Sequence, residues 1–511
     1  MKKLAVLFIL LMTVLALTAC GNQGSVDFSP LPNPTKPAPT DHPCKDGHAF
    51  VDTEQLCTRC GADYYAETLV MKLSATRDYF IVDGLGTCQR DEIVIPSTYK
   101  GLPVRELSGS SFNAVSNPVC ALITKVTIPS SITKINNNAF YKCTGLTEVT
   151  IPEGVTELGT DIFKECKNLE SISFPTTVTE IPERIVYLCD NLKHVEIKGQ
   201  ITSIGSSAFQ QCISLESLVI PESLKTVGTG AFSGCTNLQT LKLPSTLESI
   251  SRQVVDNCPM LQYNVYEGMN YLGNDNNPYV VLIGRADENQ KVVNIHKDAS
   301  VMMPTALEML DITSVTIPAK MTVPYNSLMK LPKLETIEVE TGHPVYHTAG
   351  NCLIETATKK LIRGTANSVI PNDGSVTMIE ASAFAYLQNL TSVTIPESIT
   401  HIGGGAFSQC VNLNTLVLGT GLTRIDLSAF SGCKSLTVFY AGTSTQWGYI
   451  DIPVSIGGGG MSFGDNHDLL NAPRYYYSET EPSNPVYYWH YVDGVPTPWQ
   501  EQAPEETPEE P

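Results

Sequence analysis

The sequence predicts a repeat solenoid, a stack of short β-coils, and three observations support this fold class. Cysteines recur at a 23-residue interval, a leucine or isoleucine follows each by three residues, and a phenylalanine or valine usually precedes it by three. Self-similarity at one period over most of a chain indicates stacked coils, because each repeat buries its apolar face only against its neighbours. The cysteines in step are Cys120, Cys143, Cys166, Cys189, Cys212, Cys235 and Cys258, then Cys410 and Cys433.

Each coil is expected to begin with a short strand. In the stretch "LTEVTIP", Val149 and Ile151 alternate with Glu148 and Thr150, the period of a strand with one buried face. Pro152 lacks an N–H group and ends the strand. The Ala-Phe pair and the cysteine then fall in the return segment, where we expect a short helical turn. The outward strand positions are Lys125, Thr127, Glu148, Thr150, Ser171, Ser173, His194, Glu196, Ser217, Val219, Thr240 and Lys242, then Ser392, Thr394, Thr415, Val417, Val438 and Tyr440.

The cysteine ladder is predicted to be structural. Coils stacked about 4.8 Å apart place equivalent side chains in register and pointing the same way. Their Cβ atoms then stay too far apart for the ~3.8 Å separation that a disulfide needs. Cysteine also behaves as a small apolar residue in a core. We therefore expect free, buried thiols.

These landmarks resemble the BspA-type leucine-rich repeat surface lipoprotein family over about residues 90–440. The Val-Thr-Ile-Pro motif stands at 126–129, 149–152, 315–318 and 393–396, beside recurring Ala-Phe and Cys-x-Asn-Leu motifs. The asparagine ladder of commoner leucine-rich repeats is missing. The expected fold is a β-rich leucine-rich repeat solenoid of 23-residue BspA-type coils, a right-handed superhelix with short helical turns on the return segments. A small zinc-ribbon-like module is expected at its N-terminal end.

Two stretches interrupt the repeat, 262–312 and 340–368. Both contain strand-like runs joined by turn residues, such as the "NDNNP" turn of the first. One interpretation is a hairpin carried on the edge of the solenoid. The other is a projection that contacts a ligand, since binding residues concentrate on loops held by rigid scaffolds.

The N-terminus reads as an export signal. Two lysines precede an apolar run that ends in "LTAC", and this order resembles a lipobox in which Cys20 is lipidated. The alternative is an ordinary secretory signal that contains a cysteine. Lipidation would leave the mature protein on the bacterial cell surface, outside the cytoplasm, and attached to the membrane only through its N-terminal lipid.

A compact cluster follows the Pro-rich spacer. Cys44, His48, Cys57 and Cys60 are three thiols and one imidazole within 17 residues. Four such ligands suit tetrahedral Zn²⁺, and a closed set would be structural and not catalytic. A disulfide between two of the cysteines is the competing interpretation for an exported chain.

The chain ends in an aromatic segment. A cap over the open end of the solenoid is one interpretation, because terminal repeats need a cover. A stacking platform for sugars is the other. The residues concerned are Tyr475, Tyr476, Tyr477, Tyr487, Tyr488, Trp489, Tyr491 and Trp499.

The expected order of domains follows from these features. They are a signal peptide (1–19), a Pro-rich spacer (20–43), the Cys/His module (44–65), the solenoid (66–441, interrupted at 262–312 and 340–368), the aromatic cap (442–499) and an acidic disordered tail (500–511).

Composition and motifs favour a binding protein over an enzyme. The net charge of −19 argues against nucleic acid, which needs a basic face. No recognisable catalytic set is found: "GGGG" at 457–460 lacks the Lys-Ser/Thr of a phosphate loop, and there is no Gly-x-Ser-x-Gly elbow. The family resemblance implies adhesion to host or neighbouring cells through extracellular proteins. Glycans bound by the C-terminal aromatic residues are the alternative, and a glycan-active or peptidase-like enzyme is the rival from another class.

Overall fold

The structure is a computed structural model that describes residues 69–86, 91–308, 310–324, 327–453 and 466–499. The signal peptide, the spacer, the Cys/His module and the acidic tail lie outside the described residues. The chain divides into two compact units: unit 1 comprises residues 1–240 and 253–261, and unit 2 comprises residues 241–252 and 262–511. The predicted solenoid is confirmed, with about 15 turns among the described residues.

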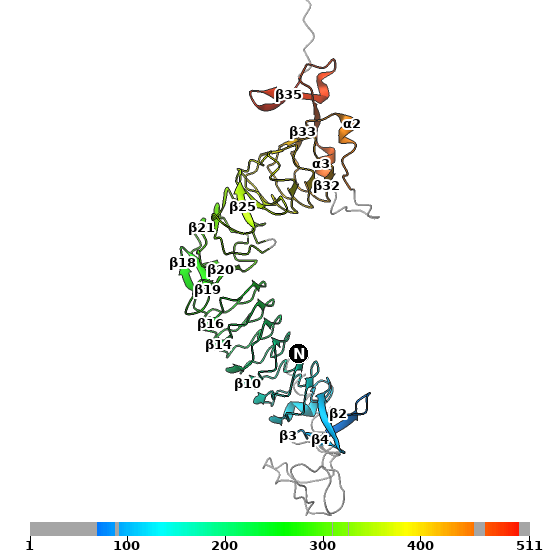
Figure 1. The fold of residues 1–511 in the computed structure, drawn as a ribbon, viewed down its shortest axis with the longest axis vertical. Coiled ribbons are helices and arrows are strands. Elements are labelled where there is room, and N and C mark those ends of the chain that lie inside the picture. Colours follow the sequence, from blue (N-terminus) through cyan, green and yellow to red (C-terminus); the bar gives the residue numbers. More distant parts are fainter. Residues whose placement is uncertain (1–68, 87–90, 309, 325–326, 454–465, 500–511) are drawn as a thin grey trace, which may run out of the picture. The chain divides into compact units, whose positions relative to one another are not determined.

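Unit 1 consists of stacked coils whose short strands form two ladders (Figure 1). The strands of both ladders are parallel, except for two antiparallel pairs at the start of the second ladder. The first-strand ladder holds β3 (Glu92–Val94), β6 (Lys125–Thr127), β8 (Glu148–Thr150), β10 (Ser171–Phe174) and β12 (His194–Ile197), followed by β14 (Ser217–Val219). The second ladder begins with β1 (Leu69–Leu73), β2 (Phe80–Leu85), β4 (Thr98–Tyr99), β5 (Leu102–Leu107), β7 (Lys134–Ile135) and β9 (Glu157–Leu158). It continues with β11 (Glu180–Ile181), β13 (Ser203–Ile204) and β15 (Thr226–Val227). Strand β16 (Thr240–Lys242) lies at the boundary of the units.

Unit 2 repeats this plan with two antiparallel excursions. It contains β17 (Ser249–Ile250), β18 (Asn264–Tyr266), β19 (Met269–Leu272), β20 (Val281–Arg285), β21 (Val292–Asn294), β22 (Val301–Met302), β23 (Ser314–Ile317) and β24 (Thr336–Val339). The second excursion and its neighbours are β25 (Tyr346–Ala349), β26 (Cys352–Glu355), β27 (Lys360–Arg363), β28 (Met378–Ile379), β30 (His401–Ile402) and β32 (Arg424–Ile425). The last first-strand sheet runs β29 (Ser392–Ile395), β31 (Thr415–Leu418), β33 (Thr437–Tyr440), β34 (Arg474–Tyr477), β35 (Tyr488–Val492) and β36 (Val495–Pro498).

The strand register follows the repeat. Val149 pairs with Ile172, and Ile172 pairs with Val195, so equivalent residues stack directly. Within β8, Val149 is buried while Glu148 and Thr150 are exposed, as the alternation predicts. The phenylalanines also stack: the ring centroids of Phe140 and Phe163 are 5.1 Å apart.

The return segments are turns, so the expected helical turn is wrong. In the coil that ends at Cys143, the N–H groups of Asn138, Phe140 and Lys142 donate to carbonyls of the next coil. A helix would use such N–H groups internally. Two of these donors, Asn138 (φ 63°) and Lys142 (φ 61°), have left-handed backbone, which breaks any helical run.

Helices are few in the part of the chain that the structure describes. They are the 3₁₀ segments η1 (Pro118–Leu122) and η2 (Pro485–Tyr487) and the short α-helices α2 (Ser444–Trp447) and α3 (His467–Asn471).

Candidate functional site

The outward side chains of the first strands form an exposed surface in each unit, which we call the strand face. In unit 1 the side chains of β6, β8, β12 and β14 alternate as predicted, with Lys125, Glu148, His194 and Ser217 exposed. Some of these side chains pair across coils. Ser173 donates a hydrogen bond to Glu196 (2.7 Å), and Lys125 lies 3.9 Å from Glu148.

The predicted outward positions are wrong in the last coil. Val438 and Tyr440 are buried, and the pairing of β31 with β33 places Thr437 beside Thr415 and Phe439 beside Val417. In this coil the segment between Cys433 and its strand is one residue shorter than the segment after Cys410. Counting the usual number of residues from Cys433 therefore assigns the outward positions one residue too far along the chain. A shift of one residue moves every side chain to the opposite face.

A shallow depression of about 380 Å³ lies on the strand face of unit 1. It crosses β8, β10, β12 and β14, and outward residues such as Thr150, Ser171 and His194 line it. Val219 at its edge is 79% exposed, an apolar side chain without cover. The depression therefore offers a mixed polar and apolar surface of the kind found in protein interfaces.

The thiol ladder has no catalytic character. All the cysteines of the described residues are free and buried, and eight of them donate an S–H hydrogen bond to a carbonyl of the preceding coil, as Cys189 does to Phe163 (3.1 Å). Burial raises the pKa of Cys189 well above its ordinary value and the pKa of Cys120 to about 12. Thiols held in the protonated form are poor nucleophiles, so the ladder is structural, as predicted.

The two interruptions are antiparallel excursions, which confirms their predicted strands. In the first, β18, β19 and β20 form a three-stranded meander, and β20 then runs parallel to β22 of the second ladder. In the second, β25, β26 and β27 do the same before β27 joins β28. The last strand of each excursion thus returns the chain to the solenoid. This arrangement agrees with the interpretation of each interruption as a hairpin on the edge of the solenoid.

The C-terminal aromatic segment continues the last sheet. Strands β34 and β35 extend it in parallel beyond β33. Trp489 is fully buried, packs against Phe439 and donates its indole N–H to the carbonyl of Tyr440 (3.0 Å). Trp499 stacks on His490 with ring centroids 3.7 Å apart. A buried ring presents no free face to a sugar, so Trp489 belongs to a cap and drops out of the expected platform.

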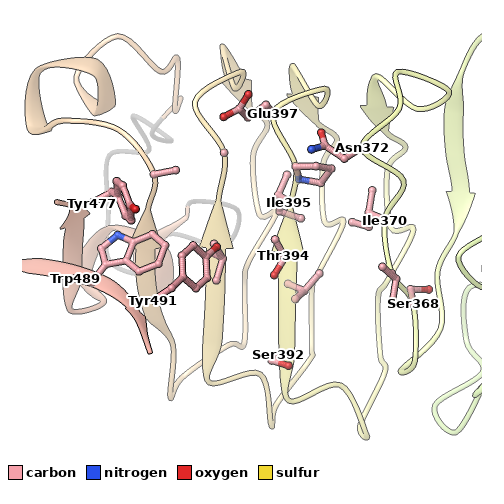
Figure 2. A pocket seen from close by; sticks show the side chains of 16 residues that line it. Ser368, Ile370, Asn372, Ser392, Thr394, Ile395, Glu397, Tyr477, Trp489 and Tyr491 are labelled. Carbon is pink, nitrogen blue, oxygen red and sulfur yellow. The ribbon is translucent and has the colours of Figure 1, made fainter. Parts of the chain in front are cut away.

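A groove of about 560 Å³ lies at the foot of this cap in unit 2 (Figure 2). Tyr477 and Tyr491 form a wall at one end, with Trp489 behind them. The floor is formed by the outward residues Ser392 and Thr394 of β29. Val417 of β31 also lines the groove. Ser368, Ile370 and Asn372 lie on the side away from the tyrosines, and Glu397 lies at the rim near Ile395. Val369 also lines the groove.

The groove opens where the first-strand ladder is interrupted. Residues 368–371 read Ser-Val-Ile-Pro, close to the strand motif of other coils, yet they form no strand. The N–H of Val369 donates instead to the carbonyl of Gly350 (2.8 Å) in the turn between β25 and β26. Within the described strands β29 therefore pairs only with β31 and is an edge strand. This break depends on a contact with the second excursion, so the Ser-Val-Ile-Pro motif alone does not predict it.

The predicted metal and lipid residues, Cys44, His48, Cys57, Cys60 and Cys20, lie outside the described residues. Elsewhere, in the described ranges, no three His, Cys, Asp or Glu side chains come together to hold a metal ion. Nor does any described helix have the length and apolar character to cross a membrane.

Comparison with known proteins identifies the repeat. The class that the coils define is a leucine-rich repeat solenoid, and the chain matches a family model described as "BspA type Leucine rich repeat region" in six copies, over residues 111–228, 202–276 and 364–447. The chain is therefore a member of the BspA-type leucine-rich repeat family. The predicted resemblance is confirmed.

Several solved structures are similar to this chain. A leucine rich cell surface protein from Faecalibacterium prausnitzii is 22% identical over 76% of this chain and 97% of its own, with a TM-score of 0.31. A leucine-rich repeat protein from Bacteroides ovatus is 21% identical over 75% of this chain and 96% of its own, with a TM-score of 0.35. A T. pallidum leucine-rich repeat protein is 21% identical over 29% of this chain and 88% of its own, with a TM-score of 0.21. Comparison with curated proteins returned no match.

Proposed function

We propose that the protein is a non-enzymatic cell-surface lipoprotein whose strand face binds proteins of a host or of neighbouring cells. The observation that supports this most directly is the depression on the strand face of unit 1, which is lined by both polar and apolar outward side chains. Stacked coils that present equivalent side chains in register form an extended surface, which repeat proteins use for binding. The acidic net charge of −19 favours partners with basic surfaces.

Attachment to the cell is part of this proposal. The "LTAC" sequence ending at Cys20 supports lipidation, and one N-terminal lipid would leave the coils free to reach a partner. Growth with radiolabelled palmitate tests this step: the wild-type chain becomes labelled, and a Cys20→Ser chain does not. Labelling of the Cys20→Ser chain would contradict it.

The partner can be sought directly. The chain carrying Cys20→Ser, which is free of lipid under this proposal, is passed over immobilised matrix proteins and cell-surface proteins. We expect saturable binding to at least one protein, weakened by salt because the charged surface contributes. A chain that binds no protein on a broad panel, or that cleaves one, would contradict the proposal.

We further propose that the coils wind as a right-handed superhelix. Connections between successive parallel strands of one sheet are right-handed in about 98% of known cases. An experimental density map of the coils tests this, since left-handed winding would be visible directly.

A further inference from the structure

The groove at the foot of the cap has chemistry that the rest of the strand face lacks. Its one charged lining residue is Glu397, and it contains no Lys, Arg or His. Its remaining polar groups are hydroxyls and an amide, and its end wall consists of tyrosines. We propose that this groove binds a neutral oligosaccharide, independently of any protein bound elsewhere on the strand face.

Ser368 is already hydrogen-bonded to Thr365 and Asn351, but the other polar side chains of the groove wall and floor are free to bind. Within the described residues the side chains of Ser392, Thr394, Asn372 and Glu397 make no hydrogen bond. On the strand face of unit 1, by contrast, Ser173 is already bonded to Glu196. Hydroxyls and amides both donate and accept, and this dual capacity matches the hydroxyl groups of a sugar.

The aromatic wall supplies a stacking surface. Tyr491 is 50% exposed and Tyr477 is 38% exposed, so each ring keeps part of its surface open. Trp489 packs edge-to-face against Tyr491, with ring centroids 4.9 Å apart, and against Tyr477 at 5.2 Å. The two tyrosines therefore rest on a fixed support, and little freedom is lost when a flat apolar sugar face stacks on them.

The floor makes room for a ligand. Gly419 and Ala441 line the groove between β29 and the aromatic wall, and neither carries a long side chain. On the far side, the interrupted ladder at residues 368–371 holds Asn372 at the rim opposite the tyrosines (Figure 2). Polar groups therefore lie on the side of the groove away from the tyrosines, where they can bond to the hydroxyls of further sugar units.

Charge decides against an acidic glycan. With no cation in the lining and a carboxylate at Glu397, a uronate or sialate would meet repulsion and have no partner. The edge of β29 could instead pair with an extended peptide. The free side-chain hydroxyls and tyrosine wall favour the sugar, and the peptide becomes an outcome of the test.

The test uses the full-length chain in a detergent that carries no sugar group. Cellohexaose, mannohexaose and xylohexaose are titrated by calorimetry, beside oligogalacturonate and an array of extended peptides. We expect saturable binding of at least one neutral hexasaccharide and none of oligogalacturonate. Tyr491→Ala should weaken that binding at least tenfold, whereas Tyr487→Ala, which changes a 62% exposed tyrosine outside the groove, should leave it unchanged.

A second variant protects the test against misfolding. Thr394→Val keeps the shape of an outward strand residue and removes one hydroxyl, so it should fold normally and weaken binding several-fold. Absence of binding to every neutral hexasaccharide, or binding that neither Tyr491→Ala nor Thr394→Val alters, would overturn the proposal. Saturable peptide binding lost in Tyr491→Ala would overturn it too and assign the groove to a peptide. None of these results bears on protein binding by the strand face of unit 1.

Discussion

Cys189 shows at the residue scale why a cysteine recurs at one position of successive coils. Its side chain is small enough to stack between the equivalent side chains of adjacent coils and, unlike alanine, it has an S–H group to donate. That group satisfies the carbonyl of Phe163 in the preceding coil, which also accepts from the N–H of Cys166. Serine could donate to the same atom, but its hydroxyl is costlier to bury.

Arg363 plays a related role where the repeat is interrupted. It is 1% exposed, and its guanidinium donates to the carbonyls of Leu331, Ala383 and Ala385. Burial lowers its pKa to about 10, so it remains protonated at neutral pH. One long side chain thus bonds the carbonyls of coils separated by the second excursion.

The buried thiols predict a loss of stability in alkali. Burial raises their pKa in the folded state, so above the ordinary thiol pKa the unfolded chain releases protons while the folded chain keeps them. The titration of these thiols therefore does not change the free energy of unfolding below about pH 8.5. Above that pH, the free energy of unfolding falls as pH rises. Each thiol contributes up to about 1.4 kcal/mol per pH unit.

Urea unfolding between pH 8 and pH 10.5 measures this slope. Cys212→Ala should lower stability at pH 8 by about 1–2 kcal/mol, through the lost hydrogen bond and packing, and should show a shallower slope. The reference is the wild-type chain with all thiols present. Identical slopes in the two proteins would show that Cys212 is not held in the protonated form.

The return turn is the element that distinguishes this coil from a helical repeat. Left-handed residues recur five residues and one residue before the cysteine position, as at Asp161 and Glu165, or Gly230 and Gly234. The strands could be predicted because apolar residues such as Val149 and Ile151 alternate with polar ones, but no such pattern predicted the turn. Lys142, Glu165 and Gln211 adopt positive φ without being glycine, because inter-coil hydrogen bonds hold them there. The groove could not be predicted from the sequence either, because it depends on the hydrogen bond between Val369 and Gly350 of the second excursion.

Two glycines of one coil are needed for different reasons, Gly230 for its backbone conformation and Gly228 for its close contact with the preceding coil. Gly230 has φ 62°, and a Cβ added there would meet no atom closer than 3.8 Å. Gly228 has an ordinary φ, but its Cβ would lie 2.5 Å from the backbone nitrogen of Ser206 in the preceding coil. Gly230→Ala should therefore lower the free energy of unfolding by about 1 kcal/mol, and Gly228→Ala by at least about 2 kcal/mol.

Thermal and urea unfolding of both variants beside the wild-type chain provide the comparison. We expect the wild-type chain to be the most stable of the three, Gly230→Ala to be less stable, and Gly228→Ala to be the least stable. A Gly228→Ala protein as stable as the wild type would mean that neighbouring coils do not approach as closely as the structure places them.

The Cys/His module, which lies outside the described residues, carries its own prediction. We propose that Cys44, His48, Cys57 and Cys60 bind one Zn²⁺ in a closed structural site. Metal analysis of the purified chain should give one zinc per molecule, removed by a strong chelator and absent in Cys57→Ser, while the ladder variant Cys189→Ala keeps it. A chain without metal whose mass shows one disulfide would support the competing interpretation.

At the scale of the whole molecule, we expect the strand face to bind proteins. Ser217 on β14 and Thr226 on β15 belong to the same coil and are both exposed, but they lie on different strand ladders. Arginine at either position adds bulk and charge to the surface without burying anything. Ser217→Arg therefore alters the strand face, whereas Thr226→Arg alters the second ladder and serves as its control.

The most direct measurement is the dissociation constant of the partner found on the protein panel, for the wild-type chain, Ser217→Arg and Thr226→Arg. Binding at the strand face of unit 1 predicts that Ser217→Arg weakens the complex at least tenfold, about 1.4 kcal/mol, whereas Thr226→Arg leaves it within twofold of the wild type. Equal affinities in all three proteins, or a loss confined to Thr226→Arg, would contradict the account.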